Sequence, residues 1–250
     1  MSVSVLLLAA STAVRAASLN LCTDEYLLLL AGPGQVASVS RLSQDPADSA
    51  LWKIARRYPA NRGSLEDALS TRPTLLLTMG GGGRATSEIA RRLQIATLDL
   101  PFPANVTDVE RNMIRVASAL GGPSLARPWQ QRLAALRRAP SPSPIDTIFL
   151  AGSGLSLSPG SPGAEWMDLA GFRQRRLAGG RATLESLTMT PPAILLRSSY
   201  RRAQRSQGRA WLDHPLARPR GSRLIETDGR PWTCAGPLML AEIERLKGLR

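Results

Sequence analysis

Histidine and lysine are scarce in this sequence of 250 residues. His214 is the single histidine, and it stands just past a predicted helix, away from the expected strand ends. A protein zinc site needs several clustered Cys, His or carboxylate ligands, and a hydrolytic dyad needs a base beside its nucleophile. No G-x-S-x-G elbow occurs, although Gly152-Ser153-Gly154 resembles one faintly. We therefore predict no catalytic residues and no metal site formed by protein ligands.

Aromatic residues are also few, at 4% of the chain, and the basic residues are dispersed. The formal net charge of +13 comes almost wholly from arginine, since Lys53 and Lys247 are the only lysines. Nucleic-acid binders usually gather basic residues on one element and place aromatic rings among them for stacking. Here arginine pairs are spread along the whole chain, at 56–57, 91–92, 137–138, 175–176 and 201–202. We therefore predict no nucleic-acid partner.

The common nucleotide-binding motifs are missing too. Residues 80–83 are consecutive glycines, but no Lys-Ser/Thr follows them, and no G-x-G-x-x-G segment follows the first strand. The pattern favours a loop between a strand and a helix at the edge of a cleft. The rival hypothesis is a cytoplasmic α/β enzyme that uses this loop to bind a sugar nucleotide or a phosphate ligand.

What the chain does contain is one pattern written twice. Residues 64–69 predict a capped short helix, followed by a proline and a buried strand over 75–77. Residues 183–187 and 194–196 repeat this pattern at the same offset. Each copy continues with an arginine-containing loop, a second helix and a second strand. In the first copy the helix is expected at 87–93 and the strand at 96–100, and in the second copy the helix at 204–212 and the strand at 223–227. Alternating strands and helices predict two α/β lobes with parallel sheets and a cleft between them.

The stretch between the two lobes is purely helical. Residues 107–120 and 124–138 have helical spacing, and an alternating Ala/Ser-Pro segment follows at 139–144. Outside the repeat we expect a helix over 48–58 and a loop over 228–236. The predicted divisions are a signal peptide at 1–16, an N-terminal lobe at 17–106, a helical segment at 107–139 and a C-terminal lobe at 140–250.

The N-terminal residues favour export to the periplasm. Residues 3–13 are apolar and small, and Val14-Arg15-Ala16 could precede a cleavage site. The alternative is that residues 3–8 form an ordinary first strand. We favour a signal peptide because a better first strand follows at 17–21.

Glu66 and Glu185 occupy equivalent positions in the two copies of the repeat. Each stands in the first turn of its helix, where a carboxylate complements the positive end of the helix. That role explains each glutamate alone but not why both lobes carry it. Two matched carboxylates on two lobes would suit a partner that offers two arginine clusters.

Three segments and the mid-chain helix carry a resemblance to a known family. The segments are Ser18-Leu19-Asn20-Leu21-Cys22-Thr23-Asp24-Glu25, the block from Gly63-Ser64-Leu65-Glu66 to Leu75-Leu76-Leu77, and Trp232-Thr233-Cys234-Ala235-Gly236-Pro237. They resemble the substrate-binding proteins of ABC importers for vitamin B12, ferric siderophores and haem. The resemblance covers essentially the whole chain after Ala17.

This resemblance implies a monomeric, non-enzymatic periplasmic receptor without a cofactor. Two Rossmann-like lobes would be joined by a rigid helix, best matched by residues 124–138. Glu66 and Glu185 would dock on an ABC permease, whose ATPase supplies the energy of import. The ligand would be a metal chelate, either cobalamin or a ferric siderophore. B12-binding members place an aromatic residue where Asn61-Arg62 stand here, and Tyr200 is the reasonable candidate for a haem-iron ligand.

The expected cleft residues follow from the ends of the predicted strands. Arginines there would suit an anionic chelate, and Trp232 could lie against a flat corrinoid or aromatic chelate. The candidate ligand-binding residues are Asn20, Cys22, Arg41, Asn61, Arg62, Gly81, Arg84, Tyr200, Arg201, Trp232 and Cys234.

Cys22 and Cys234 are the only two cysteines, and we expect them in strand-to-helix loops on opposite sides of the cleft. Two cysteines in an exported protein usually form a disulfide, which here would tie the lobes together. Two free thiols at helix N-termini could instead contact a bound metal. The disulfide is slightly favoured, and both possibilities stay open at this point.

Overall fold

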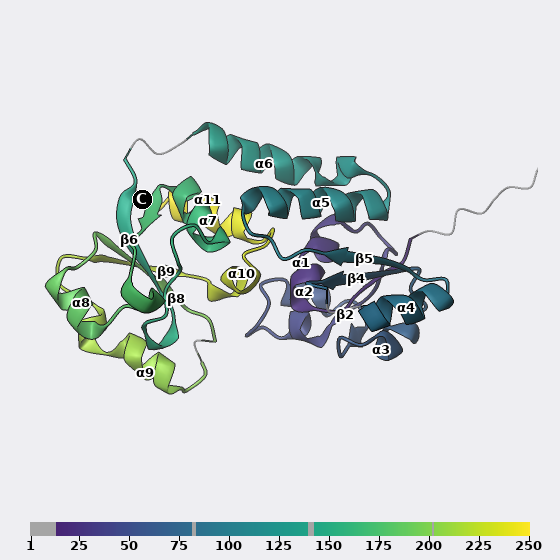
Figure 1. Cartoon of the computed structure of the whole chain (residues 1–250), viewed down its shortest axis with the longest axis horizontal. Helices are drawn as coiled ribbons and strands as arrows, with labels where there is room; N and C mark the ends of the chain where they lie inside the picture. Colours follow the sequence, from purple (N-terminus) through teal and green to yellow (C-terminus); the bar gives the residue numbers. More distant parts are fainter. Residues whose placement is uncertain (1–13, 82–83, 140–142, 202) are drawn as a thin grey trace, which may run out of the picture.

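The computed structural model describes residues 14–81, 84–139, 143–201 and 203–250. Two α/β lobes lie side by side, and each is built on its own parallel sheet (Figure 1). The predicted fold class is therefore confirmed. Of the predicted signal peptide, residues 1–13 lie outside the described residues, and Ala16 already belongs to the first strand.

The N-terminal lobe holds a five-stranded sheet and the C-terminal lobe a four-stranded sheet, and every strand pair is parallel. The strand order is β3-β2-β1-β4-β5 in the first sheet and β7-β6-β8-β9 in the second. The strands are β1 (Ala16–Ser18), β2 (Val36–Ser40), β3 (Ala60–Asn61), β4 (Leu75–Met79), β5 (Ala96–Leu100), β6 (Ile145–Leu150), β7 (Phe172–Gln174), β8 (Ile194–Ser198) and β9 (Arg223–Thr227).

The two sheets share one plan. Strand β4 belongs to the first copy of the repeat and pairs with the edge strand β5, and β8 of the second copy pairs with the edge strand β9 in the same way. Short helices precede β4 and β8, and longer helices follow them. The duplication in the sequence is therefore a duplication in topology, with one additional edge strand, β3, in the N-terminal lobe.

Successive side chains of the central strands point to opposite faces of each sheet, and they contribute to one core shared by the lobes and to two outer cores. Leu75 and Leu77 point into a core that continues through the helices into the C-terminal lobe, where Leu196 belongs to it. Leu76 and Leu195 point the other way, into smaller cores on the outer face of each lobe. Because successive strand side chains alternate between faces, a continuous apolar strand serves both cores. The lobes are thus joined by packed apolar side chains and not by a hinge alone.

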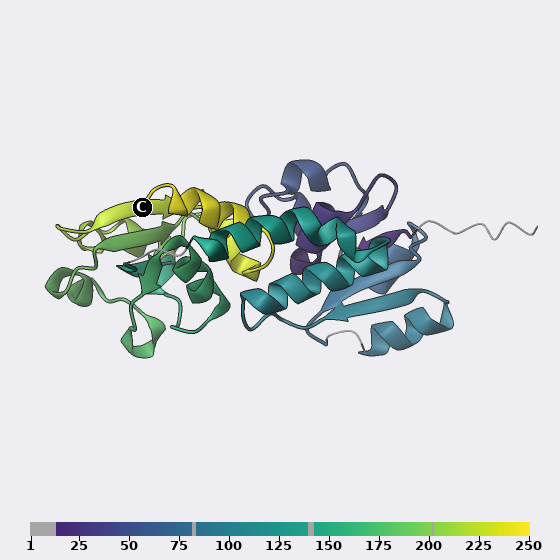
Figure 2. The ribbon, with the colours of Figure 1, turned by 90° about the horizontal axis from the view of Figure 1, so that it is seen from above.

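Helices α5 (Val106–Leu120) and α6 (Arg127–Arg138) form the layer that covers this shared core. Figure 2 shows α5 over the N-terminal lobe and α6 running from there across to the C-terminal lobe. Asn105 caps α5, two residues before the predicted cap Thr107, and its side chain accepts a hydrogen bond from the Asp108 N–H. Gly121, at a φ of 140°, ends α5 in a backbone conformation that favours glycine.

The remaining helices correct two expectations. The helix predicted over 48–58 is limited to four residues, so residues 45–51 form a polar loop instead. The loop predicted over 228–236 contains a short helix capped by Asp228. The α-helices are α1 (Leu21–Leu30), α2 (Trp52–Ala55), α3 (Leu65–Leu69), α4 (Arg84–Arg92), α7 (Pro162–Ala170), α8 (Leu184–Met189), α9 (Gln207–Asp213), α10 (Gly229–Cys234) and α11 (Met239–Lys247).

Candidate ligand-binding cleft

Two adjoining pockets lie between the lobes, beyond the carboxyl ends of β2, β8 and β9. The larger has a volume of about 860 Å³ and is lined mainly by the C-terminal lobe, with Pro46 and Ala47 from the N-terminal lobe. The smaller has a volume of about 560 Å³ and is lined by the N-terminal lobe together with Arg201. Pro46 and Arg201 line both pockets. The carboxyl ends of parallel strands are where open α/β sheets bind ligands.

A polar contact between the lobes separates the two pockets. We call it the latch, and it consists of Asp48, Tyr200 and Arg201. The Asp48 carboxylate is 4% exposed and accepts hydrogen bonds from Arg201 Nε at 2.9 Å and Arg201 Nη2 at 2.8 Å. The Tyr200 hydroxyl donates to Asp48 Oδ1 at 2.8 Å. Hydrogen bonds with Tyr200 and Asp48 raise the pKa of Arg201, so the guanidinium stays charged.

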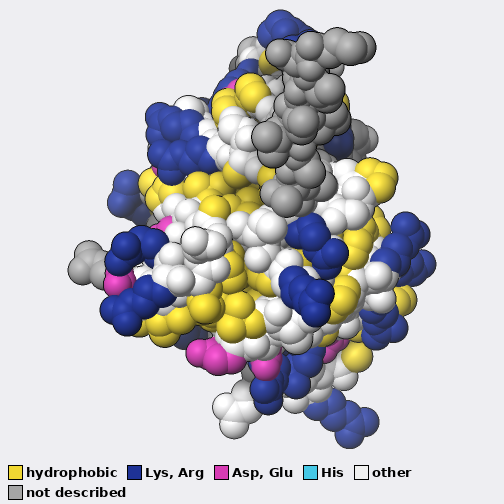
Figure 3. Space-filling view, turned by 90° about the vertical axis from the view of Figure 1, so that its right-hand side faces the viewer, with side chains coloured by type: hydrophobic (Ala, Val, Ile, Leu, Met, Phe, Trp, Pro, Cys, Tyr) yellow, Lys and Arg dark blue, Asp and Glu magenta, His cyan; other side chains and the backbone are white. Residues whose placement is uncertain are grey.

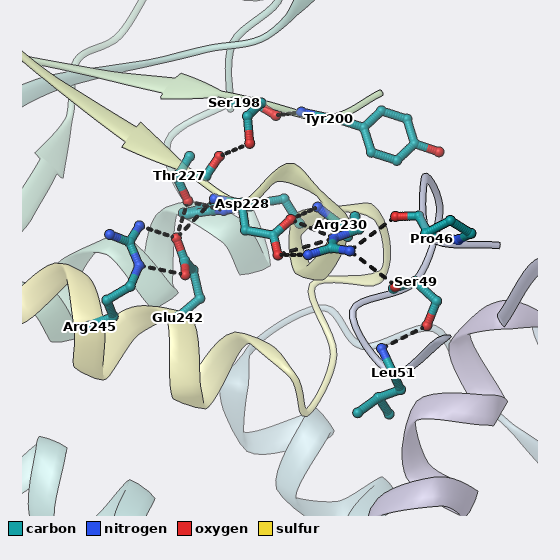
Figure 4. Close-up of polar contacts among 12 residues, drawn as sticks. Pro46, Ser49, Leu51, Ser198, Tyr200, Thr227, Asp228, Arg230, Glu242 and Arg245 are labelled. Atoms are coloured by element: carbon teal, nitrogen blue, oxygen red, sulfur yellow. Dashed lines mark hydrogen bonds and ion pairs between the residues drawn. The ribbon is translucent and has the colours of Figure 1, made fainter. Parts of the chain in front are cut away.

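Arg230 makes a second contact between the lobes, close to the latch. Figure 4 shows its guanidinium reaching the backbone of the loop at 46–49, where Nη1 donates to Pro46 O at 3.0 Å and to Ser49 O at 3.3 Å. Its other side holds the Asp228 carboxylate at 2.7 Å. Burial alone would raise the pKa of Asp228, but the hydrogen bonds from Arg230 lower it.

A covalent bond also joins the two lobes. A disulfide joins Cys22, in the first turn of α1, to Cys234, the last residue of α10. The free-thiol alternative therefore does not hold in this structure, and both cysteines lie in helices and not in the expected loops. We call this disulfide and the segment 234–238 the junction.

Two tryptophans fix the junction from the helical layer. Trp129 Nε1 of α6 donates to Pro237 O, and Trp166 Nε1 of α7 donates to Ala235 O, both at 3.0 Å. The two indole rings meet edge to face, with centroids 6.4 Å apart. Ala235 adopts a φ of 45°, a left-handed conformation that a residue other than glycine adopts only when its surroundings impose it. The junction is therefore held by side chains from three helices.

Helix α1 carries two buried carboxyl groups: Glu25 lies beside the junction, and Asp24 lies at the end of β2, where it accepts the Ser40 N–H at 3.0 Å. Complete burial raises the pKa of Glu25 well above its usual range, and the nearby Asp24 charge raises it further. A hydrogen bond from the Leu238 N–H lowers this pKa, but by less than burial raises it. Burial also raises the pKa of Asp24 to about 7, against the effect of hydrogen bonds from Ser18, Ser40 and Ser43. Glu25 Oε2 has no hydrogen-bond partner among the described residues. A neutral Glu25 is the form that such an environment stabilises.

The structure uses several predicted cleft residues of the N-terminal lobe in other ways. Asn20 caps α1, and Asn61 is buried, its amide donating to Ser18 O and Ser38 Oγ. Arg62 is exposed and pairs with Asp67 at 2.7 Å. Arg41 lines the smaller pocket.

Two further candidates belong to the glycine loop. Gly81 donates its N–H to the Asp99 carboxylate at 3.0 Å. The Arg84 side chain lies outside the described residues.

Of the cleft residues predicted in the C-terminal lobe besides Cys234, two contact the N-terminal lobe and one packs within its own lobe. Tyr200 and Arg201 form the latch. Trp232 packs its ring against Phe149, with centroids 4.6 Å apart, and donates Nε1 to Thr227 Oγ1 at 2.8 Å. Its indole is half-buried, and its contacts with Phe149 and Thr227 fix its orientation.

Sequence reasoning missed Asp48 and Arg230 as cleft residues. Asp48 fell within the helix predicted over 48–58, and its partners stand 152 and 153 residues further along the chain. Arg230 fell at the expected strand end but was not singled out there. A usable signal existed for Asp48, because Asp45-Pro46-Ala47-Asp48 is a turn sequence and not a helix interior.

The paired glutamates are exposed in both lobes. Glu66 stands in the first turn of α3, capped by Ser64, and Glu185 in the first turn of α8, capped by Thr183. Figure 1 shows α3 and α8 on the outer side of their lobes, away from the layer of α5 and α6. No ion pair engages either carboxylate within the described part of the chain.

Solved structures of periplasmic binding proteins share this fold. The haem-binding protein HutB of Vibrio cholerae superposes with a TM-score of 0.70 at 18% identity, over 95% of this chain and 99% of that one. The siderophore-binding protein BauB, bound to two acinetobactin molecules and ferric iron, gives a TM-score of 0.69 at 15% identity, over 94% and 93%. The vitamin B12-binding protein BtuF of Vibrio cholerae gives a TM-score of 0.62 at 18% identity, over 94% and 95%.

These likenesses concern the fold. No protein-family model matches the sequence, and no curated protein matches it either. None of the described helices is long and apolar enough to cross a membrane. The described residues also contain no group of three or more His, Cys, Asp or Glu side chains placed to hold a metal ion.

Proposed function

We propose that this chain is a periplasmic receptor that binds a metal chelate between its lobes and delivers it to an ABC permease. The observation that carries the proposal is the pair of arginine-lined pockets between two lobes that share one core. A largely pre-formed cleft of several hundred Å³ suits a small ligand better than a macromolecule. The fold shared with haem-, siderophore- and B12-binding proteins supports the same class of ligand.

The cleft favours an anionic chelate over a neutral one. Arginines outnumber acids around the two pockets, and guanidinium groups bind carboxylate or catecholate oxygens in a planar, two-point geometry. The lining arginines are Arg41, Arg56, Arg201, Arg230 and Arg245, and the lining acids are Asp45, Asp48, Glu226 and Asp228. Thermal-shift screening and native mass spectrometry against haem, several ferric siderophores and cobalamin test this. Stabilisation by an iron chelate supports the proposal, and no response to any of them contradicts it.

The matched glutamates are proposed to dock on the permease. Uptake by cells that carry the Glu66→Arg/Glu185→Arg variant should fall by at least about tenfold, since two charge-assisted contacts become repulsive. Glu88→Arg, on the exposed helix α4, is the control for a change in surface charge. Unchanged uptake by the double variant contradicts the docking role.

The enzyme hypothesis is weakened by the chemistry of the glycine loop. The Asp99 carboxylate accepts the Gly81 N–H, so a negative charge stands where a phosphate would need a donor. A Cβ on Gly80 would lie 2.1 Å from the Phe102 ring, which gives this glycine a packing reason. Figure 3 shows Lys and Arg side chains in separate groups between apolar surface at the N-terminal-lobe end, and this dispersion does not favour nucleic acid.

A further inference from the structure

We propose that Asp48 is an internal competitor of the ligand: its carboxylate occupies an anion-binding position formed by Tyr200 and Arg201, and an anionic group of the chelate replaces it. This inference rests on the proposed function and adds the charge class of the ligand and the residue that selects it.

The latch has the geometry of ligand recognition and not of a surface ion pair. Two nitrogens of one guanidinium meet both oxygens of one carboxylate, and a phenol hydroxyl completes the set. The carboxylate is 4% exposed, whereas most ion pairs of this chain have far more exposed acids. Among the described residues, the Asp48 side chain accepts hydrogen bonds from no other donors. An N-terminal-lobe anion is thus bound entirely by the C-terminal lobe.

The backbone at Arg201 supports a site poised for exchange. Arg201 adopts a φ of 47°, in the left-handed region that side-chain-bearing residues rarely enter. This conformation turns its guanidinium toward the N-terminal lobe, where it lines both pockets. Arg201 lies three residues past the end of β8, in a turn where the Gln204 N–H donates to Arg201 O at 2.8 Å, so the loop that carries the latch adopts this conformation at the boundary of two cavities.

Other charges around the smaller pocket favour an incoming anion. Arg41 makes no hydrogen bond or ion pair with the described residues. The Arg56 guanidinium donates to Gln44 O and lies over the Trp52 ring, 4.8 Å from its centroid. Asp45 is engaged locally, where its carboxylate accepts the Ala47 N–H at 2.7 Å. When the Asp48 carboxylate turns away, the guanidinium groups of Arg41, Arg56 and Arg201 line the smaller pocket. Asp45 is then its one remaining carboxylate.

Replacement of Asp48 makes the latch a filter for ligand charge. An anionic ligand restores the hydrogen bonds of Tyr200 and Arg201 that Asp48 gives up. A neutral ligand leaves a guanidinium without its counter-ion, and such an unpaired group opposes binding. The junction stays closed throughout, because an exchange of polar partners at the latch breaks neither its disulfide nor its tryptophan hydrogen bonds.

Binding by two coloured probes tests the competition. Haemin carries two free carboxylates. Cyanocobalamin has no free carboxylate and no net charge: its side chains end in amides, and the charge of its cobalt centre balances that of its one phosphodiester. Asp48→Asn should tighten haemin binding about tenfold, since the fraction of protein with a free anion position rises. It should change cyanocobalamin binding less than twofold. Asp146→Asn is the matched control, because Asp146 also forms a two-point pair with an arginine, Arg175, away from the cleft.

A measurement without any chelate separates this inference from the proposed function. Citrate at high concentration should increase hydrogen–deuterium exchange of residues 45–49 in the wild-type protein, relative to sodium chloride at equal ionic strength. Arg201→Gln should show the increased exchange without citrate and no further response to it. Unchanged exchange with citrate, or weaker haemin binding by Asp48→Asn, overturns the inference. Failure of both chelates with a normal citrate response contradicts the proposed function alone.

Discussion

The latch and the junction, two of the contacts between the lobes, differ in their chemistry. The junction is covalent and half-buried, and it is fixed by two indole N–H donors and the disulfide. The latch is ionic and lies between two pockets, with Tyr200 38% exposed. Hydrogen bonds and ion pairs can exchange one polar partner for another at small net cost, whereas a disulfide opens only when it is reduced or exchanged with a thiol. Ligand exchange in this chain should therefore occur at the latch, with the junction unchanged.

Removal of the disulfide should have the largest effect on stability. The bond closes a loop of 212 residues, and in the chain-entropy model a loop of that size stabilises by about 5 kcal/mol. Urea unfolding of Cys22→Ser/Cys234→Ser should show this loss, and reduced wild-type protein should match the variant. A loss below about 1 kcal/mol would mean that apolar packing alone fixes the junction.

The acids of α1 should make the junction sensitive to pH. The pKa of Asp24 is raised from 3.8 to about 7, so the folded state holds a proton that the unfolded state releases. Stability is therefore greatest below pH 4 for this group and falls as pH rises to about 7, by an amount on the order of 4 kcal/mol. The raised pKa of Glu25 continues the loss at higher pH.

Unfolding free energies between pH 5 and pH 8.5 measure this dependence. Glu25→Gln, a neutral isostere, should remove part of the slope at high pH and leave the variant more stable than wild type there. Identical slopes for the variant and the wild type would show that Glu25 does not titrate between folded and unfolded states.

Local signals in the sequence were sufficient for the repeated parts of both lobes. The apolar runs at 75–77 and 194–196 and their capped helices are short-range patterns, and β5 and β9 match their predicted bounds. Strands β3 and β7 have two and three residues, too few for a periodic pattern. Their place in the sheets depends on neighbours far along the chain.

The site was harder to predict because it depends on contacts over more than 150 residues. Arg41, Tyr200 and Arg201 could be expected at strand ends, since parallel strands bring those ends together. Nothing local distinguishes Asp48, which gains its role only when the other lobe supplies its donors. Asn61 was predicted as a cleft residue because it stands at a strand end. Its side chain is buried instead, and its amide hydrogen-bonds to Ser18 and Ser38.

A change of intermediate size should strain the junction without cutting it. A Cβ on Gly236 would lie 2.8 Å from Glu25 Oε2, inside a packed region where the carboxyl group has little freedom. Gly236→Ala should destabilise by about 1–3 kcal/mol, as overpacking does in other cores. Gly248→Ala, where the nearest atom is 3.4 Å away, is the matched control in thermal unfolding. Equal melting temperatures for the two variants would indicate that the junction adapts.

The smallest effect should come from the latch. Tyr200→Phe removes one hydrogen bond to Asp48 and leaves the Arg201 pair intact, so it should destabilise by about 1 kcal/mol. Tyr58→Phe is the control, since the described residues give its hydroxyl no hydrogen-bond partner. Hydrogen–deuterium exchange of the backbone amides should rise at residues 45–49, beside the latch, in Tyr200→Phe. At residues 234–238, in the junction, it should stay as in wild type. Because the two segments are read in one experiment, a parallel rise in both would mean that the latch and the junction open together and that the lobes separate as units.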